Sequence, residues 1–94
     1  MTKQDKIFQP GTILHEVIVG AFRSSGSSFE AWCRTNDVKP STARTATCGQ
    51  AGGEVGSAML ERIIDAAGRE MIELAYSKRV IREAAKLENA QGGA

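Results

Sequence analysis

Apolar residues recur in this chain at intervals of three and four, the spacing that places them on one face of a helix. The clearest stripe lies near the N-terminal end and consists of Ile13, Leu14, Val17, Ile18, Ala21 and Phe22. The β-branched residues 17–19 alone would suit a strand, but the helical spacing continues across the whole segment. We therefore predict a helix at about 12–23, with Thr12 as its N-cap.

The same pattern predicts further helices and no strand. They are expected at about 28–36, 40–48, 54–67 and 69–89. Gly26, the glycine-rich loop 49–53 and Gly68 separate them, because glycine readily adopts the backbone angles that end a helix. Polar residues 1–9 are expected to form a flexible arm, and residues 90–94 a disordered tail. The predicted fold class is all-α, one compact five-helix domain with a long C-terminal helix.

Residues 27–48 read as two short helices joined by a tight turn. Ser27 followed by Glu30 is typical of a capping box, in which each side chain binds a backbone N–H at the start of a helix. Asn36 and Asp37 tolerate a left-handed backbone, so the first of the two helices is expected to end there.

The second of these helices has an unusual surface. Pro40 suits its first turn, because the N–H that proline lacks would be unpaired there in any case. Beyond Pro40 the helix is poor in large apolar side chains and rich in hydroxyls, and it carries Arg44. Such a helix contributes little to a core, but it suits the hydrogen-bonding edges of bases in the DNA major groove.

The segment resembles the helix-turn-helix of phage-repressor-type regulators, the lambda repressor and Cro class. That motif has a small residue in the first helix, a turn residue four positions on, an apolar residue next, and a Ser/Thr-rich start to the second helix. The matching residues are Cys33, Asp37, Val38, Ser41 and Thr42. Residues 9–14 are similar to the Pro-Gly-x-x-Leu opening of antitoxin-like members, and residues 60–68 to their fourth helix.

Four positions depart from the family pattern. Asp37 stands where the turn glycine is common, and Phe29 stands where a glutamine usually contacts a phosphate. Ala43 and Ala46 replace bulkier aliphatic residues in the second helix of the motif.

The resemblance implies a DNA-binding domain over 10–68, whose recognition helix at about 40–48 enters the major groove of double-stranded DNA. The expected DNA contacts are Lys39, Ser41, Thr42, Arg44, Thr45 and Gln50, with Ser27 and Ser28 at a backbone phosphate. Arg44 is the expected reader of a guanine edge, through its paired donors. The protein is then a transcriptional regulator of phage or mobile-element type, and activation and repression both stay open.

The predicted C-terminal helix, 69–89, has apolar residues on two faces. One stripe is Met71, Leu74, Ile81 and Ala85, and the other is Ile72, Tyr76, Val80, Ala84 and Leu87. Two stripes exceed what one small core requires, so we expect the second stripe to bind a symmetry mate in a homodimer. A helix that simply lies across its own core is the alternative.

Composition and charge exclude several classes of protein. With 94 residues and a net charge of +1, the chain is one domain without the large basic excess of a purely electrostatic DNA binder. Cys33 and Cys48 lack the paired spacing of a zinc motif, and the one histidine, His15, is expected at the surface. We therefore predict no metal, no cofactor and no enzymatic activity.

Two further patterns argue against a nucleotide-binding loop and against a membrane or secreted protein. The glycine-rich stretch 49–56 has neither a preceding strand nor the Lys-Ser/Thr that ends a nucleotide-binding loop. No apolar run is typical of a signal peptide or a membrane span. The two cysteines suggest no disulfide framework, so a cytoplasmic location is expected.

Two alternative functions remain open at this point. The near-neutral charge and the small Ala43 and Ala46 would also fit a protein-interaction module, such as an anti-activator or adaptor with a degenerate helix-turn-helix. The Pro-Gly-x-x-Leu opening would also fit an antitoxin that binds both a toxin and its own promoter.

Overall fold

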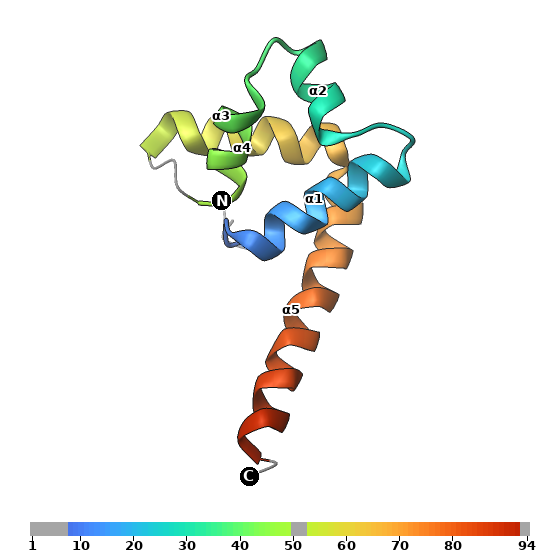
Figure 1. The fold of residues 1–94 in the computed structure, drawn as a ribbon, viewed down its shortest axis with the longest axis vertical. Helices are drawn as coiled ribbons and strands as arrows, with labels where there is room; N and C mark the ends of the chain where they lie inside the picture. Colours follow the sequence, from blue (N-terminus) through green and yellow to red (C-terminus); the bar gives the residue numbers. More distant parts are fainter. Residues whose placement is uncertain (1–7, 50–52, 93–94) are drawn as a thin grey trace.

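The computed structural model describes residues 8–49 and 53–92, and this part of the chain is helical without strands. The elements are α1 (Thr12–Ser24), α2 (Phe29–Thr35), α3 (Pro40–Thr47), α4 (Gly53–Ala67) and α5 (Arg69–Gly92) (Figure 1). The predicted all-α, five-helix fold is confirmed. The helix at the C-terminal end runs to Gly92, so residues 90–92 do not belong to a disordered tail as predicted.

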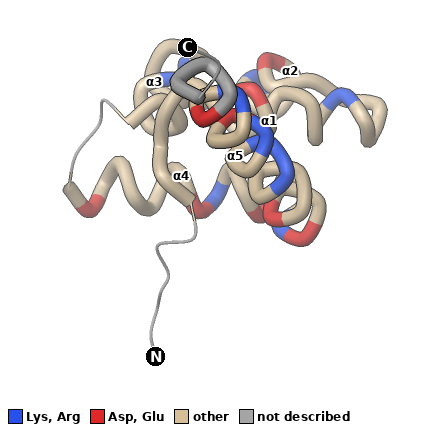
Figure 2. The backbone as a smooth tube through the Cα atoms, turned by 90° about the horizontal axis from the view of Figure 1, so that it is seen from below, with Lys and Arg blue, Asp and Glu red and all other residues tan. Residues whose placement is uncertain are grey.

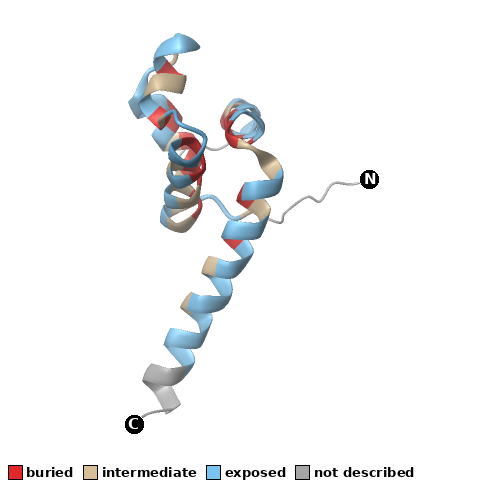
Figure 3. Ribbon diagram, turned by 90° about the vertical axis from the view of Figure 1, so that its right-hand side faces the viewer, coloured by how far each residue is buried: buried red, intermediate tan, exposed pale blue. Residues whose placement is uncertain are grey.

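Helices α1 to α4 and the start of α5 surround one core. Its fully buried large side chains include Leu14 and Ile18 of α1, Phe29 of α2 and Ile63 of α4. The remainder of α5 projects away from this body, and its residues from Val80 to Glu88 are exposed apart from half-buried Glu83 (Figure 3). Among the described residues, no helix combines the length and the apolar character needed to cross a membrane.

The stripe predicted for α1 is confirmed, but the predicted N-cap is wrong. Leu14, Ile18 and two further residues of the stripe are buried. Thr12 is the first helical residue, and the N-cap is Gly11, which makes no side-chain cap. The Gly11 N–H instead donates to the Thr47 carbonyl at 3.0 Å, which ties the start of α1 to the end of α3.

The predicted capping box of α2 is displaced by one residue. The N-cap is Ser28, whose Oγ accepts a hydrogen bond from the Ala31 N–H at 3.0 Å. The Ser27 N–H already donates to the Phe22 carbonyl at 3.0 Å, as part of the turn that ends α1 at Gly26. Ser27 is therefore held outside α2, and Glu30 is one position too early to complete the box.

The turn between α2 and α3 ends α2 with a Schellman motif. The Val38 N–H donates to the Cys33 carbonyl at 2.8 Å, and the Asp37 N–H donates to the Arg34 carbonyl at 3.3 Å. Asp37 has a φ of 57°, the left-handed conformation that glycine usually supplies at this position. Half-buried Val38 packs against the core above buried Cys33, so the turn fixes how α3 leaves α2.

We expect Asp37→Gly to stabilise the fold by up to about 1 kcal/mol, because glycine adopts a left-handed backbone without the Cβ penalty. Asp37 is exposed, so the change removes no buried contact. Chemical denaturation of the two proteins measures the difference. Asp37→Ala is the control: it should be no more stable than wild type, and equal gains for glycine and alanine would contradict this account.

The start of α5 corrects the predicted dimer stripe. Gly68, with a φ of 110°, separates α4 from α5 and directs Ile72 and Tyr76 into the core, where they are 0% and 8% exposed. These two residues are therefore not available to a symmetry mate. Val80 and Leu87 continue the same stripe beyond the body of the protein and are 39% and 64% exposed.

The single tyrosine and the single tryptophan make contacts in different parts of the fold. Tyr76 accepts a hydrogen bond at its hydroxyl from the Gln9 N–H at 3.0 Å, and Phe8 packs edge-on against its ring. Phe8 and Gln9, predicted to belong to a flexible arm, are thus attached to α5, whereas residues 1–7 lie outside the described part of the chain. The guanidinium group of Arg62 in α4 lies over the ring of half-buried Trp32 in α2. The Arg62 Cζ is 5.5 Å from the centroid of the Trp32 ring.

Candidate nucleic-acid interface

Helix α3 buries small side chains and exposes polar ones. Ala43, Ala46 and Thr47 are 0%, 4% and 0% exposed and face the core. The absence of large side chains on this face lets α3 lie close to α4. Most of the remaining side chains of α3 point to solvent.

The structure brings most of the predicted DNA-contacting residues together on this exposed side. Lys39, Ser41, Thr42 and Arg44 are exposed, and Thr45 is half-buried. The spacing of three and four residues places Ser41, Arg44 and Thr45 on one face of the helix. The Thr45 hydroxyl donates to the Ser41 carbonyl at 2.8 Å, so its proton is used within α3.

The other predicted contacts are more scattered. Ser27 is exposed and Ser28 is half-buried, with the Ser28 Oγ engaged in the cap of α2. Gln50 lies outside the described residues.

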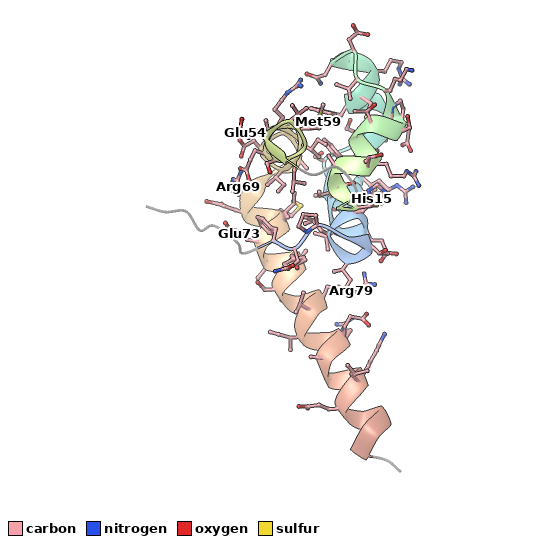
Figure 4. The ribbon with its side chains drawn as sticks, turned by 90° about the vertical axis from the view of Figure 1, so that its left-hand side faces the viewer. His15, Glu54, Met59, Arg69, Glu73 and Arg79 are labelled. Carbon is pink, nitrogen blue, oxygen red and sulfur yellow. The ribbon has the colours of Figure 1, made fainter. Side chains whose placement is uncertain are left out.

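His15 was expected at the surface, and this prediction is wrong. The His15 ring is half-buried between α1 and α3, packs edge-on against Phe29 at 5.2 Å, and has its Nδ1 2.8 Å from the Thr47 Oγ1 (Figure 4). The Thr47 hydroxyl donates to the Arg44 carbonyl at 3.1 Å, so in the matching tautomer the Nδ1–H of His15 donates to Thr47. This chain of hydrogen bonds holds the C-terminal end of α3 against α1.

Burial lowers the pKa of His15, and the nearby Arg44 guanidinium lowers this pKa further. The folded state therefore favours the neutral imidazole, and the unfolded state binds more protons. Stability should then be fully present above about pH 6.5, the ordinary pKa of histidine, and decrease as the pH falls below it.

We expect His15→Asn to reduce this pH dependence, because the Asn amide can donate to Thr47 but does not titrate. Denaturant midpoints between about pH 7.5 and 5.5, a window above the usual carboxylate pKa values, measure the effect. An undiminished slope in the variant would show that His15 is not the group responsible.

Basic and acidic side chains are interleaved near α3. Arg23, Arg34 and Lys39 are exposed, as are the acidic Glu30 and Asp37. Figure 2 likewise shows both Lys or Arg and Asp or Glu on several helices of the molecule. The exposed charges near α3 therefore include both signs.

A surface groove of about 390 Å³ adjoins the same side of α3. Its walls come from α1, α2 and α3, and its polar lining residues are His15, Glu16, Arg23, Glu30 and Arg44. Sequence periodicity gave no sign of this groove, because its residues are far apart in the chain.

The cysteines form no reactive or metal-binding centre in the described part of the chain. Burial raises the pKa of the Cys33 thiol, and the carboxylate of Glu30 raises this pKa further. Cys48 is half-buried. No group of three His, Cys, Asp or Glu residues within the described ranges is arranged to hold a metal ion.

No family model, no curated protein and no solved structure matches this chain.

Proposed function

We propose that the protein is a sequence-specific DNA-binding transcriptional regulator of repressor-like helix-turn-helix type. The observation that carries the proposal is the two-sided character of α3. One side is held in the core by Ala43, Ala46 and Thr47, and the other presents hydroxyls and a guanidinium to solvent. A rigidly mounted polar helix of this kind suits insertion into the major groove.

The predicted DNA-contacting residues of α3, and Lys39 just before it, each have a role in this proposal. Arg44 reads a guanine edge with its paired donors. Ser41 and Thr42 contact bases or phosphates at the N-terminal end of the helix, and Lys39 just before it neutralises a phosphate. Thr45 accepts hydrogen bonds from the DNA, because its proton is already donated to Ser41.

A second copy of the chain belongs to the proposal, because regulators of this class bind two half-sites as twofold pairs. The exposed part of the predicted stripe, Val80, Ala84 and Leu87, supplies the contact on α5. The protein acts in the cytoplasm, as a regulator of phage or mobile-element type.

The proposal is tested by measuring binding to duplex DNA taken from upstream of the protein's own coding sequence, beside a scrambled duplex. We expect tighter binding to the natural duplex. The affinity should fall by about 0.9 decades per decade of salt for every phosphate neutralised. Equal, weak binding to both duplexes at all salt concentrations would contradict the proposal.

A protein-interaction module is the second candidate function. The interleaved carboxylates of Glu30 and Asp37 favour it, because they oppose a phosphate backbone. An anti-activator, an adaptor or an antitoxin would use the same surfaces to bind a protein. Failure of the DNA experiment, together with retained folding, would favour this function.

A further inference from the structure

The groove beside α3 is walled by residues from three helices. Glu16 and Arg23 lie on α1, Glu30 on α2 and Arg44 on α3. Figure 4 places His15 at the junction of α1 and α3, on the other side of the molecule from Arg69 and Glu73. The groove therefore belongs to the exposed side of the helix-turn-helix segment and not to the projecting half of α5.

A glycine inside α1 lines this groove without a structural reason in the protein itself. Gly20 is in the interior of the helix Thr12–Ser24, where glycine costs about 1 kcal/mol relative to alanine. Its φ is not in the left-handed region, and a Cβ added there would meet no atom within 4 Å. Neither backbone conformation nor internal packing requires the glycine. It does leave the backbone of α1 open to close approach from the groove.

The charges around the groove favour an anion. Arg23 and Arg44 both line it, and within the described residues neither forms an ion pair. Glu16 is paired with Arg79, whose Nη1 lies 2.8 Å from the Glu16 Oε1. Arg79 also binds Glu83, and Glu83 has Lys86 as a second partner, so these two carboxylates are balanced by two cations. Glu30 is left as the opposing carboxylate of the groove. Two guanidinium groups against one carboxylate give a net positive groove, and guanidinium groups bind carboxylates and phosphates through paired hydrogen bonds.

The volume of the groove favours an anion larger than a bare inorganic ion. A volume of about 390 Å³ falls within the range of about 300–1,000 Å³ typical of small-molecule sites. A bare inorganic anion would fill only a small part of it. We propose that the groove binds a small organic acid, whose carboxylate or phosphate group lies between Arg23 and Arg44. The body of the acid lies against Gly20, and Glu30 accepts a hydrogen bond from a hydroxyl or amino group.

This site has a regulatory consequence that rests on the proposed function. Arg44 is shared between the groove and the surface assigned to DNA, so an acid bound to its guanidinium competes with a guanine edge. Because linkage is reciprocal, DNA must weaken binding of the acid as much as the acid weakens binding of DNA. The groove would make the regulator responsive to a metabolite.

The binding itself is tested without DNA, by NMR titration of backbone amides in the full chain. The probes are succinate, L-glutamate, glucose 6-phosphate and, for comparison, inorganic phosphate. We expect at least one organic acid to shift the Gly20 amide saturably, with a Kd below about 1 mM. No saturable shift with any organic probe overturns the proposal. An equal affinity for inorganic phosphate overturns the assignment to an organic acid.

Two variants localise the site. Arg23→Gln and Gly20→Leu should each weaken binding at least about tenfold. Gly20→Leu should fold at least as stably as wild type, because leucine has the higher helix propensity and its Cβ would meet no atom within 4 Å. Ala58→Leu, at an exposed position of α4, is the matched control and should leave the affinity unchanged. Undiminished binding by both groove variants would overturn the proposal.

DNA titrations separate this inference from the proposed function. If an organic acid binds but no duplex does, the proposed acid site is supported and the proposed function is contradicted. If the natural duplex binds and no organic acid does, the inference alone fails. Shifts of the groove amides with duplex DNA only would assign the groove to a backbone phosphate, which also overturns it.

Discussion

Arg44→Ala should cost about 1–3 kcal/mol in binding to the natural duplex, a loss of about 5- to 150-fold in affinity. The loss should be much smaller on the scrambled duplex, because a bidentate contact to a guanine edge exists only at the correct sequence. The fold should be unaffected. The Arg44 side chain is exposed, and the hydrogen bond from Thr47 ends on its backbone carbonyl, which alanine retains.

Lys39→Ala and Arg82→Ala are the controls for this measurement. Lys39→Ala removes a phosphate contact, so it should weaken binding to both duplexes alike and reduce the salt slope by about 1. Arg82 lies on the exposed surface of α5, away from α3, and its substitution should change neither affinity nor slope. An equal loss on both duplexes for Arg44→Ala would mean that Arg44 contacts phosphate and reads no base.

Gly49→Ala should destabilise the fold by about 2–3 kcal/mol, an effect with two sources. Gly49 has a φ of 85° at the end of α3, where a left-handed backbone strains residues other than glycine. A Cβ at this position would also lie 2.9 Å from the Pro10 carbonyl oxygen, which is a backbone atom and cannot simply rotate away. The change should therefore also loosen the Gly11–Thr47 hydrogen bond beside it.

Gly26→Ala separates these two sources. Gly26 has nearly the same φ, 84°, but a Cβ there would meet no atom within 4 Å. It should lose only the strain, about 1 kcal/mol. Denaturation curves for both variants measure the difference, and equal losses would show that the contact with Pro10 contributes nothing.

Much of the fold could be predicted from local pattern. The stripe of α1, the glycine that ends it and the helical positions of α2 to α4 follow from spacing and turn chemistry within a few residues. The cap of α2 could not be chosen in this way, because Ser27 and Ser28 have equal capping ability. The choice depends on the Ser27 N–H, which the end of α1 has already used.

Contacts between distant residues explain the other errors. Periodicity gave two apolar stripes on α5, but which of them is buried depends on where α1 lies, and only the structure places Ile72 and Tyr76 in the core. His15 and Thr47 are 32 positions apart, and the local pattern around either residue does not indicate that the two side chains meet. The groove depends on three helices, and of its residues only Arg44 had been predicted to bind a ligand.

Tyr76 and Trp32 lie at separate contacts, so the optical signal of each residue reports on a different part of the fold. Trp32 fluorescence senses whether α2 stays against Arg62 of α4, and Tyr76 absorbance senses whether Phe8 and Gln9 stay attached to α5. Because the chain holds one residue of each type, selective excitation isolates Trp32 and second-derivative absorbance separates Tyr76 from the overlapping tryptophan band. Release of Phe8 and Gln9 from α5 can thus be followed separately from opening of the helix-turn-helix segment, in unlabelled protein.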